Sequence, residues 1–306
     1  MARTAPISPP VSISRPVIVG IGEVLWDMLP GGKQLGGAPA NFAYHANALG
    51  AQGVVASRVG DDKLGGEALR RLESLGLGVS YVSTDRDRAT GRVDVRLDPN
   101  GVPDYVIHDA VAWDFIPLDD RLLDLADGAE AVCFGTLAQR SAVSRETIRA
   151  FVRATRARCL RVLDINLRQK YFDGPTIRES LRYASVLKLN DSELPVVARL
   201  LGLEGGRREV IDGLLAAYPL QVIAFTRGPE GSVLYAHGRT SDHPGLRAEV
   251  VDTVGAGDAF TAALVIGLLA GRDLDRINAF ANRIASYVCS QPGATPPIPG
   301  ELTEWT

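Results

Sequence analysis

The chain is poor in cysteine and offers no cysteine-based framework for its fold. Its 306 residues include three cysteines, Cys133, Cys159 and Cys289, which lie far apart and form no CxxC motif. An odd number of scattered thiols argues against structural disulfides and is typical of a reducing compartment. The four histidines show neither an HExxH motif nor a Cys/His pairing, so no zinc site is expected. We therefore expect a cytoplasmic protein.

Long apolar runs and an excess of basic charge are also missing. The longest apolar run, Ala259 to Ala270, is interrupted by Thr261 and Gly267, and a membrane span needs roughly 20 apolar residues. The chain has 33 basic and 36 acidic side chains, a net charge of -3. Nucleic-acid binding depends on a basic surface field. We expect neither a membrane nor a nucleic acid as a partner.

The first 16 residues differ from the rest in composition. They are rich in proline and serine and lack the basic start and apolar core of a secretory signal. We expect residues 1–16 to form a disordered leader. No linker or tandem repeat divides the remainder, so residues 17–306 should form one large domain.

Strand-like and helix-like stretches alternate along that domain. Val17–Gly22 is short, β-branched and closed by glycine, and Asn41–Leu49 is helix-like and ends at Gly50. The same alternation continues through Val54–Val59, Leu64–Leu75, Ala131–Phe134, Ser144–Arg156, Leu160–Asp164, Thr176–Tyr183, Val186–Leu189, Ser192–Leu201, Arg208–Tyr218 and Val222–Thr226. Strands joined by helices of this length favour right-handed crossovers and a mostly parallel sheet. The predicted class is α/β.

One segment departs from this rhythm. From Thr90 to His108, apolar and polar residues alternate around Pro99-Asn100-Gly101. This pattern predicts an antiparallel hairpin with one solvated face. Within a parallel fold, the hairpin should stand off the main sheet as a small lid; an edge hairpin is the alternative.

A glycine-rich run offers the best place for chemistry. Asp252-Thr253-Val254-Gly255-Ala256-Gly257-Asp258 follows an expected strand, Ala248–Val251, and opens the most apolar helix of the chain. The glycines would let backbone N–H groups converge at a helix start, where an anion is favoured. Asp258 could accept a proton from a hydroxyl while the amides hold a phosphoryl group. Alternatively, the glycines form only a tight turn and Asp258 only caps the helix.

The common nucleotide motifs do not occur in this sequence. A P-loop requires GxxxxGK[ST], but Gly32-Lys33 is followed by Gln34. The dinucleotide fingerprint GxGxxG fails because Leu25 stands where the third glycine should follow Gly20 and Gly22. An NAD-linked oxidoreductase is therefore not expected.

The first strand and first helix suggest a second binding region. Asp27 follows the first strand, and Gly36, Gly37 and Asn41 lead into the first helix. The polar side chains could exchange hydrogen bonds with a polyol, and the glycine pair would allow close backbone approach. Alternatively, Asn41 is a helix N-cap.

Together, the two regions resemble a known family. Gly36-Gly37 with Asn41, and the run from Asp252 to Asp258, resemble the two signatures of the PfkB, or ribokinase-like, sugar kinases. The resemblance extends from about Val17 to about Pro299. It implies a three-layer α/β/α sandwich with a mostly parallel central sheet and a small β lid contributed by about residues 24–35 and 90–110. It also implies that two copies could pair through the lid.

The resemblance implies ATP-dependent transfer of the γ-phosphate to a sugar hydroxyl. Asp258 would be the base, and Gly255, Ala256 and Gly257 would form the anion hole. The sugar would be held by Asp27, Gly36, Gly37, Asn41 and Asp258.

The resemblance also implies nucleotide and metal sites. Glu193 would hold Mg²⁺ through water, and Asp252 would hold a potassium-like ion (K⁺). For Asn190 and Glu193, helix capping and a first-turn acid are the alternatives. The nucleotide would be bound by Asn190, Glu193, Thr226, Gly228, Gly231, Gly255, Gly257 and Asn282.

Two features bear on the sugar. Asp164-Ile165-Asn166-Leu167-Arg168 resembles the D-x-N-x-R run of fructokinases and 2-keto-3-deoxygluconate kinases. Arg168 could reach the transferring phosphate or the sugar; a salt bridge between helices is the alternative. The ketodeoxygluconate kinases carry a Tyr-x-Arg element on the lid that grips a carboxylate. Here Tyr105 is followed by Val106-Ile107-His108, which favours a neutral sugar.

The resemblance therefore favours a fructokinase. A 2-keto-3-deoxygluconate kinase, a ribokinase and a nucleoside kinase stay open as alternatives within the family. A sugar or nucleotide sensor on the same fold is the alternative without catalysis.

Overall fold

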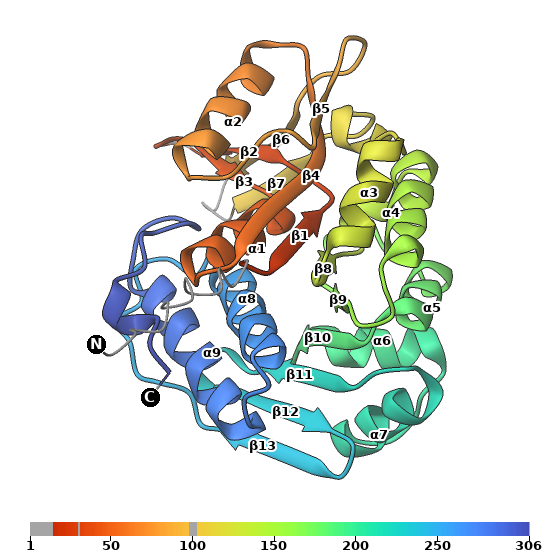
Figure 1. Ribbon diagram of the computed structural model, residues 1–306, viewed down its shortest axis with the longest axis vertical. Coiled ribbons are helices and arrows are strands. Elements are labelled where there is room, and N and C mark those ends of the chain that lie inside the picture. Colours follow the sequence, from red (N-terminus) through yellow and green to blue (C-terminus); the bar gives the residue numbers. More distant parts are fainter. Residues whose placement is uncertain (1–14, 30, 98–102, 306) are drawn as a thin grey trace, which may run out of the picture.

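A computed structural model describes residues 15–29, 31–97 and 103–305 of the chain (Figure 1). The strands form two sheets, one of nine strands and one of four. Of the expected leader, only Arg15 and Pro16 belong to the described residues. The Pro99-Asn100-Gly101 turn of the expected hairpin also lies outside them.

The large sheet is mostly parallel, as predicted. Its strand order is β13-β12-β11-β10-β9-β8-β1-β4-β5. Every neighbouring pair from β11 to β5 is parallel, and only the pairs β11–β12 and β12–β13 are antiparallel, so β12 alone runs against the other strands of this sheet. The strands are β1 (Val17–Ile21), β4 (Gln52–Gly60), β5 (Val82–Asp85), β8 (Ala131–Phe134), β9 (Leu160–Asp164), β10 (Val186–Asn190), β11 (Val222–Thr226), β12 (Ser232–Ala236) and β13 (Arg239–His243).

Helices cover both faces of this sheet and complete the predicted three layers. In Figure 1, α1 (Ala38–Ala48), α8 (Ala256–Leu269) and α9 (Leu274–Cys289) lie on one side, and α3 to α7 lie on the other. Successive residues of a strand point to opposite faces of the sheet. Because helices cover both faces, both sets of side chains are buried and mostly apolar. The remaining helices are α2 (Lys63–Ser74), α3 (Asp120–Gly128), α4 (Ala142–Ala154), α5 (Gly174–Tyr183), α6 (Glu193–Leu201) and α7 (Arg207–Ala217), with short 3₁₀ helices η1 (Ala112–Phe115), η2 (Leu137–Gln139), η3 (Gly228–Glu230) and η4 (Gly300–Leu302).

The small sheet stands off the large one, in the upper part of Figure 1. Its strand order is β3-β2-β6-β7, and β6 pairs with β2 in parallel and with β7 antiparallel. The expectation of a lid therefore holds, and the edge-hairpin alternative is wrong. The hydroxyl of Tyr171 donates to the carbonyl of Ile107 at 3.2 Å and ties the lid to the body. The lid strands are β2 (Leu25–Leu29), β3 (Gly32–Gly36), β6 (Gly91–Leu97) and β7 (Pro103–Ile107).

One expected strand is absent. Ala248–Val251 was predicted as a strand leading into the glycine turn, but residues 244–250 have no regular secondary structure. Val250 and Val251 are 62% and 60% exposed. A β-branched run forms a strand only where a neighbouring strand can pair with it, and this segment instead crosses the surface between β13 and α8.

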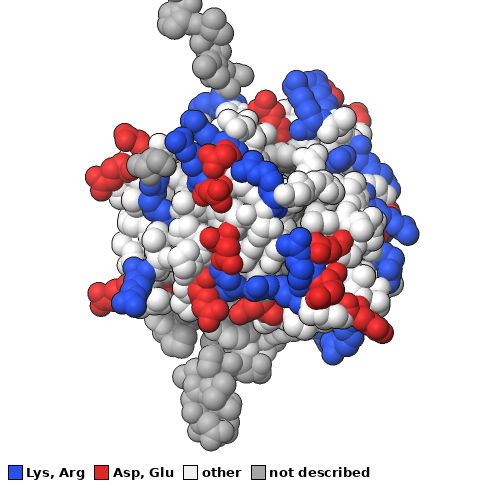
Figure 2. Space-filling model, turned by 90° about the horizontal axis from the view of Figure 1, so that it is seen from below, with Lys and Arg blue, Asp and Glu red and all other residues white. Residues whose placement is uncertain are grey.

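Charges of both signs are mixed over the surface. Figure 2 shows basic and acidic side chains interspersed over the face seen from below. In the part of the chain that the structure describes, no helix is both long and apolar enough to cross a membrane.

The packing of α1 on β1 gives a stability prediction. A Cβ on Gly20 would lie 2.1 Å from the carbonyl oxygen of Pro39, so Gly20→Ala must push α1 away from the sheet. We expect a loss of about 3 kcal/mol in the free energy of unfolding, measured by denaturant titration. Gly128→Ala is the matched control, because no atom lies within 4 Å of its Cβ position. Equal stability of the two variants would contradict this packing.

Candidate active site

The candidate site lies at the carboxyl ends of the parallel strands, where α8 begins. Gly255 precedes α8 with a φ of 79° and places Asp258 in the first turn. A Cβ on Gly255 would lie 2.4 Å from the carbonyl oxygen of Ala294. Only glycine fits this backbone conformation and this close approach. The positive end of the helix dipole at this start favours an anion beside Asp258.

Asn41 holds Asp258 from the neighbouring helix. Its Nδ2 donates to Asp258 Oδ2 at 2.9 Å, and its side chain is buried. α1 begins at Ala38 after Gly37 as the N-cap residue, so the alternative that Asn41 is an N-cap is wrong. The structure brings together two residues that the sequence placed in separate motifs.

The partly buried carboxyl group of Asp258 is poised to exchange a proton near neutral pH. Burial raises its pKa to about 7, and the nearby charge of Asp164 adds to the rise. The hydrogen bond from Asn41 and the charges of Lys188 and Arg168 oppose the increase. A carboxylate with this pKa suits a general base, because its proton affinity matches the working pH.

A buried ion pair lies beneath the glycine turn. Lys188 of β10 and Asp164 of β9 are register partners, and Lys188 Nζ lies 3.1 Å from Asp164 Oδ1. Thr261 Oγ1 of α8 donates to Asp164 Oδ2 at 3.1 Å. The pair was missed from the sequence. A lysine inside the apolar strand around Val186 was the available signal, because a charge there requires a partner.

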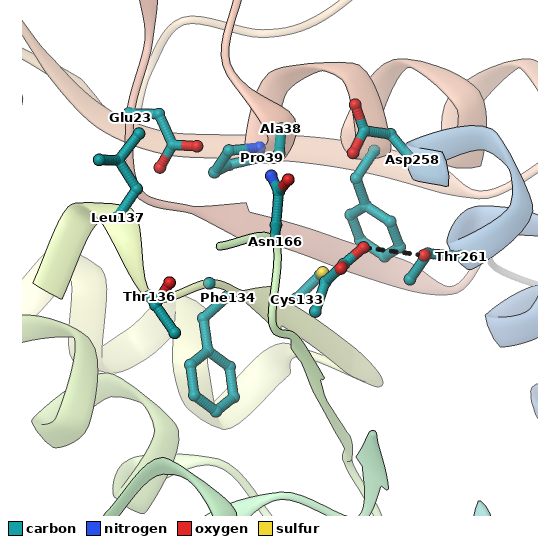
Figure 3. Close-up of a pocket in the computed structure, with 13 residues that line it drawn as sticks. Glu23, Ala38, Pro39, Cys133, Phe134, Thr136, Leu137, Asn166, Asp258 and Thr261 are labelled. Atoms are coloured by element: carbon teal, nitrogen blue, oxygen red, sulfur yellow. Dashed lines mark hydrogen bonds between the residues drawn. The ribbon is translucent and has the colours of Figure 1, made fainter. Parts of the chain in front are cut away.

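A small cavity opens between the start of α1, the ends of β8 and β9, and the start of α8. Its lining includes Glu23, Thr136, Asp164, Asn166 and Asp258. In Figure 3 the carboxyl groups of Glu23 and Asp258 lie at opposite ends, with Asn166 between them. Burial raises the pKa of Glu23 to about 7, while the charge of Arg168 opposes this rise. No role for Glu23 was predicted; its position directly after the first strand was the only signal.

The residues expected to hold the sugar lie around the lid. Asp27 is on β2, next to the hairpin partner β3 that ends at Gly36. A Cβ on Gly36 would lie 2.4 Å from Asp27 Oδ2, and one on Gly37 would lie 2.3 Å from the carbonyl oxygen of Glu23. Both glycines therefore make room for acidic residues of the site.

Arg168 lies in the loop after β9. Its side chain is exposed, and its charge opposes the rise in pKa of Glu23, Asp27 and Asp258 that burial causes. Across the described residues, Arg168 forms no ion pair. The alternative of a salt bridge between helices is therefore wrong.

Glu193 and Asn190 connect two strand ends. Glu193 Oε1 accepts from the backbone N–H of Leu167 at 3.0 Å, and Oε2 accepts from that of Asn190 at 2.8 Å. Asn190 Oδ1 accepts from the N–H of Glu193 at 2.9 Å, so it does cap the start of α6. Each Glu193 oxygen keeps a second lone pair. This donor set fits a hydrated Mg²⁺ held through water, since Mg²⁺ usually keeps several waters.

The remaining nucleotide-side residues fall into two groups. Thr226 ends β11, and Gly228 and Gly231 follow it with φ values of 54° and 76°. Asn282 is buried in α9, and its Nδ2 donates to Ser232 Oγ at 2.7 Å. Thr226 thus ends a strand beside Asn190, Gly228 and Gly231 lie in the turn that follows, and the amide of Asn282 has a partner within the protein.

Asp252 joins two loops beside the glycine turn. Its Oδ1 accepts from the N–H of Val254 at 3.0 Å, and its Oδ2 accepts from that of Gly293 at 3.1 Å. No group of three or more His, Cys, Asp or Glu side chains within residues 15–29, 31–97 and 103–305 could hold a metal ion. The lone pairs left on Asp252 fit a monovalent cation, which can take its other ligands from backbone carbonyls.

Comparison with known proteins identifies the family and the fold of the chain. A pfkB family carbohydrate kinase domain matches residues 30–301. The chain belongs to this family. The uncharacterized sugar kinase PH1459 of Pyrococcus horikoshii is 30% identical over 297 residues, which covers 91% of each chain. A fructokinase of Escherichia coli is 28% identical over 296 residues, covering 91% of this chain and 95% of that protein.

Solved structures of carbohydrate kinases share the fold. The structure of PH1459 in complex with ATP matches with a TM-score of 0.79 and 29% identity, covering 91% of this chain and 94% of that one. A fructokinase of Xylella fastidiosa with bound ATP matches with a TM-score of 0.82 at 20% identity, covering 92% and 95%. The expected ribokinase-like fold is therefore confirmed.

The contact between Gly36 and Asp27 can be tested in this kinase. Gly36→Ala should displace the Asp27 carboxylate and raise the KM for the sugar ~10-fold, the equivalent of about 1.4 kcal/mol, with an unchanged KM for ATP. Gly31→Ala is the control on the same hairpin, because its Cβ would meet no atom within 4 Å. Steady-state kinetics on both variants measure the effect, and an unchanged sugar KM in Gly36→Ala would remove Asp27 from the sugar site.

Proposed function

We propose that this chain is an ATP-dependent fructokinase. The observation that carries the proposal is the Asn41–Asp258 hydrogen bond of 2.9 Å beside the Gly255 turn. The bond holds a carboxyl group with a pKa of about 7 in the first turn of α8, which supports Asp258 as a base beside a helix start that favours anions. The two solved relatives with bound ATP support ATP as the donor, and the Escherichia coli relative supports fructose as the acceptor.

Asp258 and the turn before it have separate tasks in the reaction: Asp258 accepts a proton, and the turn stabilises the phosphoryl group. As the sugar oxygen forms its bond to the γ-phosphorus, the bond from that phosphorus to the β,γ-bridging oxygen breaks and ADP leaves. The hydroxyl proton passes to Asp258, which must be ionised to accept it. The backbone N–H groups of Gly255, Ala256 and Gly257 stabilise the charge on the transferring phosphoryl group. Phosphoryl transfer depends mainly on such positioning and charge stabilisation.

Neighbouring residues orient the two substrates. Arg168 adds a positive charge beside Asp27 and Asp258, where phosphoryl oxygens would pass. Glu193 would hold hydrated Mg²⁺, which neutralises phosphate charge when bound, and Asp252 would hold K⁺ beside the turn. The lid would exclude water, the competing acceptor.

The lid favours a neutral sugar. Asp27, Val93 and Ile107 are register neighbours across β2, β6 and β7 and share one face of the lid. The carboxylate of Asp27 accepts hydrogen bonds from hydroxyl groups but repels a substrate carboxylate. An acidic sugar would need a cation in this place, as the Tyr-x-Arg element supplies.

Two further parts of the proposal concern the whole molecule. The three cysteines are free thiols, which supports a reducing, cytoplasmic location. Pairing of two copies through the lid stays a prediction from the family resemblance, and light scattering of the full chain measures it.

The sugar is tested by a coupled assay with ATP and Mg²⁺. Fructose should give a kcat/KM at least ~10-fold above ribose and 2-keto-3-deoxygluconate, a difference of about 1.4 kcal/mol in transition-state binding. A preference for either other sugar would contradict fructose while leaving the kinase assignment intact. Phosphorylation of none of the three would contradict the proposed function.

The base is tested by its pH dependence. Since burial raises the pKa of Asp258 to about 7, kcat/KM for fructose should rise with pH through this value and level off above it. Below it, the proton occupies the base and activity falls tenfold per pH unit. Asp258→Asn should lower kcat by ~10²–10⁴ while ATP still binds.

Glu23→Gln separates the two acids of the site. Glu23 has a pKa of about 7 as well, so either group could produce the acid limb. The limb should persist in Glu23→Gln. Its loss in that variant, or turnover of Asp258→Asn within tenfold of the parent, would show that Asp258 is not the base.

A further inference from the structure

The buried pair Lys188–Asp164 joins the first residue of the D-x-N-x-R run to the neighbouring strand β10, and neither residue has yet been given a role. On the face of the sheet that α8 covers, the strand residues around the pair are apolar, including Val162, Val186 and Ala224. Lys188 and Asp164 are 7% and 4% exposed. Taking two charges out of water is costly, and an apolar pair of the same size would pack at least as well. Their presence therefore calls for a role other than stability.

The ammonium group of Lys188 lies close beneath the glycine turn. Nζ lies 3.1 Å from the position that a Cβ on Gly257 would occupy. An ammonium group has three N–H donors, and within the described part of the chain only Asp164 accepts a hydrogen bond from it. Two donors are thus left beneath the start of α8, next to the residue that precedes Asp258.

The pair is also fixed to the helix that carries Asp258. Thr261 Oγ1 lies 3.1 Å from Asp164 Oδ2 and 2.9 Å from the carbonyl oxygen of Gly257. Thr261 is one turn after Gly257 on α8, so strand β9, strand β10 and the first turn of α8 meet at one point. A displacement of Lys188 or Asp164 would therefore also displace the first turn of α8.

We propose that Lys188 is a positioning residue for phosphoryl transfer: its ammonium group, fixed by Asp164 beneath Gly257, keeps Asp258 ionised and adds positive charge under the anion hole. This role rests on the proposed function of Asp258 as the base. The pair acts through opposite charges, so its two members should move the titration of Asp258 in opposite directions.

The charges around both groups are consistent with this role. Burial lowers the pKa of Lys188, but the surrounding carboxylates outweigh burial and raise it, so the group stays charged. The titratable or charged groups that face Asp258 or Lys188 are Glu23 after β1, Cys133 of β8, Asp164 of β9, Arg168 in the following loop and Glu193 of α6.

The test compares Lys188→Met with Asp164→Asn. Loss of the cation should raise the pKa of Asp258, and loss of the anion should lower it, each by on the order of one pH unit. The titration is followed by carboxyl ¹³C NMR of the full chain labelled at aspartate, with the Asp258 signal identified by its absence in Asp258→Asn. The acid limb of kcat/KM should shift in the same two directions.

A merely structural pair would give another result. Both variants would then lose thermal stability, and the Asp258 midpoint would stay where it is in the parent; that outcome overturns the proposal. If Lys188→Met fails to fold, Asp164→Asn alone decides, because a midpoint that does not fall contradicts the role of the pair. The double variant Lys188→Met with Asp164→Asn should regain the stability that Lys188→Met loses, since no unpaired charge remains.

The NMR titration separates this inference from the proposed function. Opposite shifts of the Asp258 midpoint in a chain that phosphorylates no sugar would support the electrostatic role and reject the kinase assignment to fructose. Phosphorylation of fructose by a chain whose Asp258 midpoint does not move in either variant would support the proposed function and reject the electrostatic role of Lys188.

Discussion

The main physical constraint on this structure is the burial of several carboxyl groups in one cavity. Asp258 and Glu23 line one cavity with Asp164, and burial alone would leave the first two largely protonated. The start of α8, the amide of Asn41 and the cations Lys188 and Arg168 offset that tendency. Each of these partners comes from a different part of the chain, so the charge balance of the site also fixes how the layers meet.

The glycines serve this arrangement through close approach. Gly255 lies against Ala294, Gly36 against the Asp27 carboxylate, and Gly37 against the carbonyl of Glu23. A Cβ at each of these positions would collide with the group named and force it to move. Phosphoryl transfer loses rate steeply with such displacement. The signature glycines are therefore as much steric requirements as sources of backbone freedom.

Much of the fold followed from local patterns. Short β-branched runs between amphipathic helices predicted the parallel sheet, and alternation from Thr90 to His108 predicted the lid hairpin. The strand prediction for the valine-rich segment before Asp252 was wrong. A local pattern carries no information on whether a neighbouring strand is present to pair with the segment.

The site was predictable in part. The turn at Gly255 with Asp258 has a distinctive spacing, whereas the partners of Asp258 depend on tertiary contacts. Asn41 was assigned to the sugar rather than to Asp258, which is 217 residues away. Lys188 and Asp164 become partners only through the register of β9 and β10. No spacing rule within one strand would reveal either contact.

That separation of 217 residues also has a consequence for biosynthesis. When Asn41 leaves the ribosome, the helix that will bring it Asp258 has not yet been translated, and β1 still awaits β8, its partner on one side. The lid and the first strands can assemble early, but Asn41 and Asp258 meet only after more than four fifths of the polypeptide has been made. If Asp258 is the base, a chain that ends before α8 lacks it, and regain of turnover during refolding reports the docking of α8 against α1.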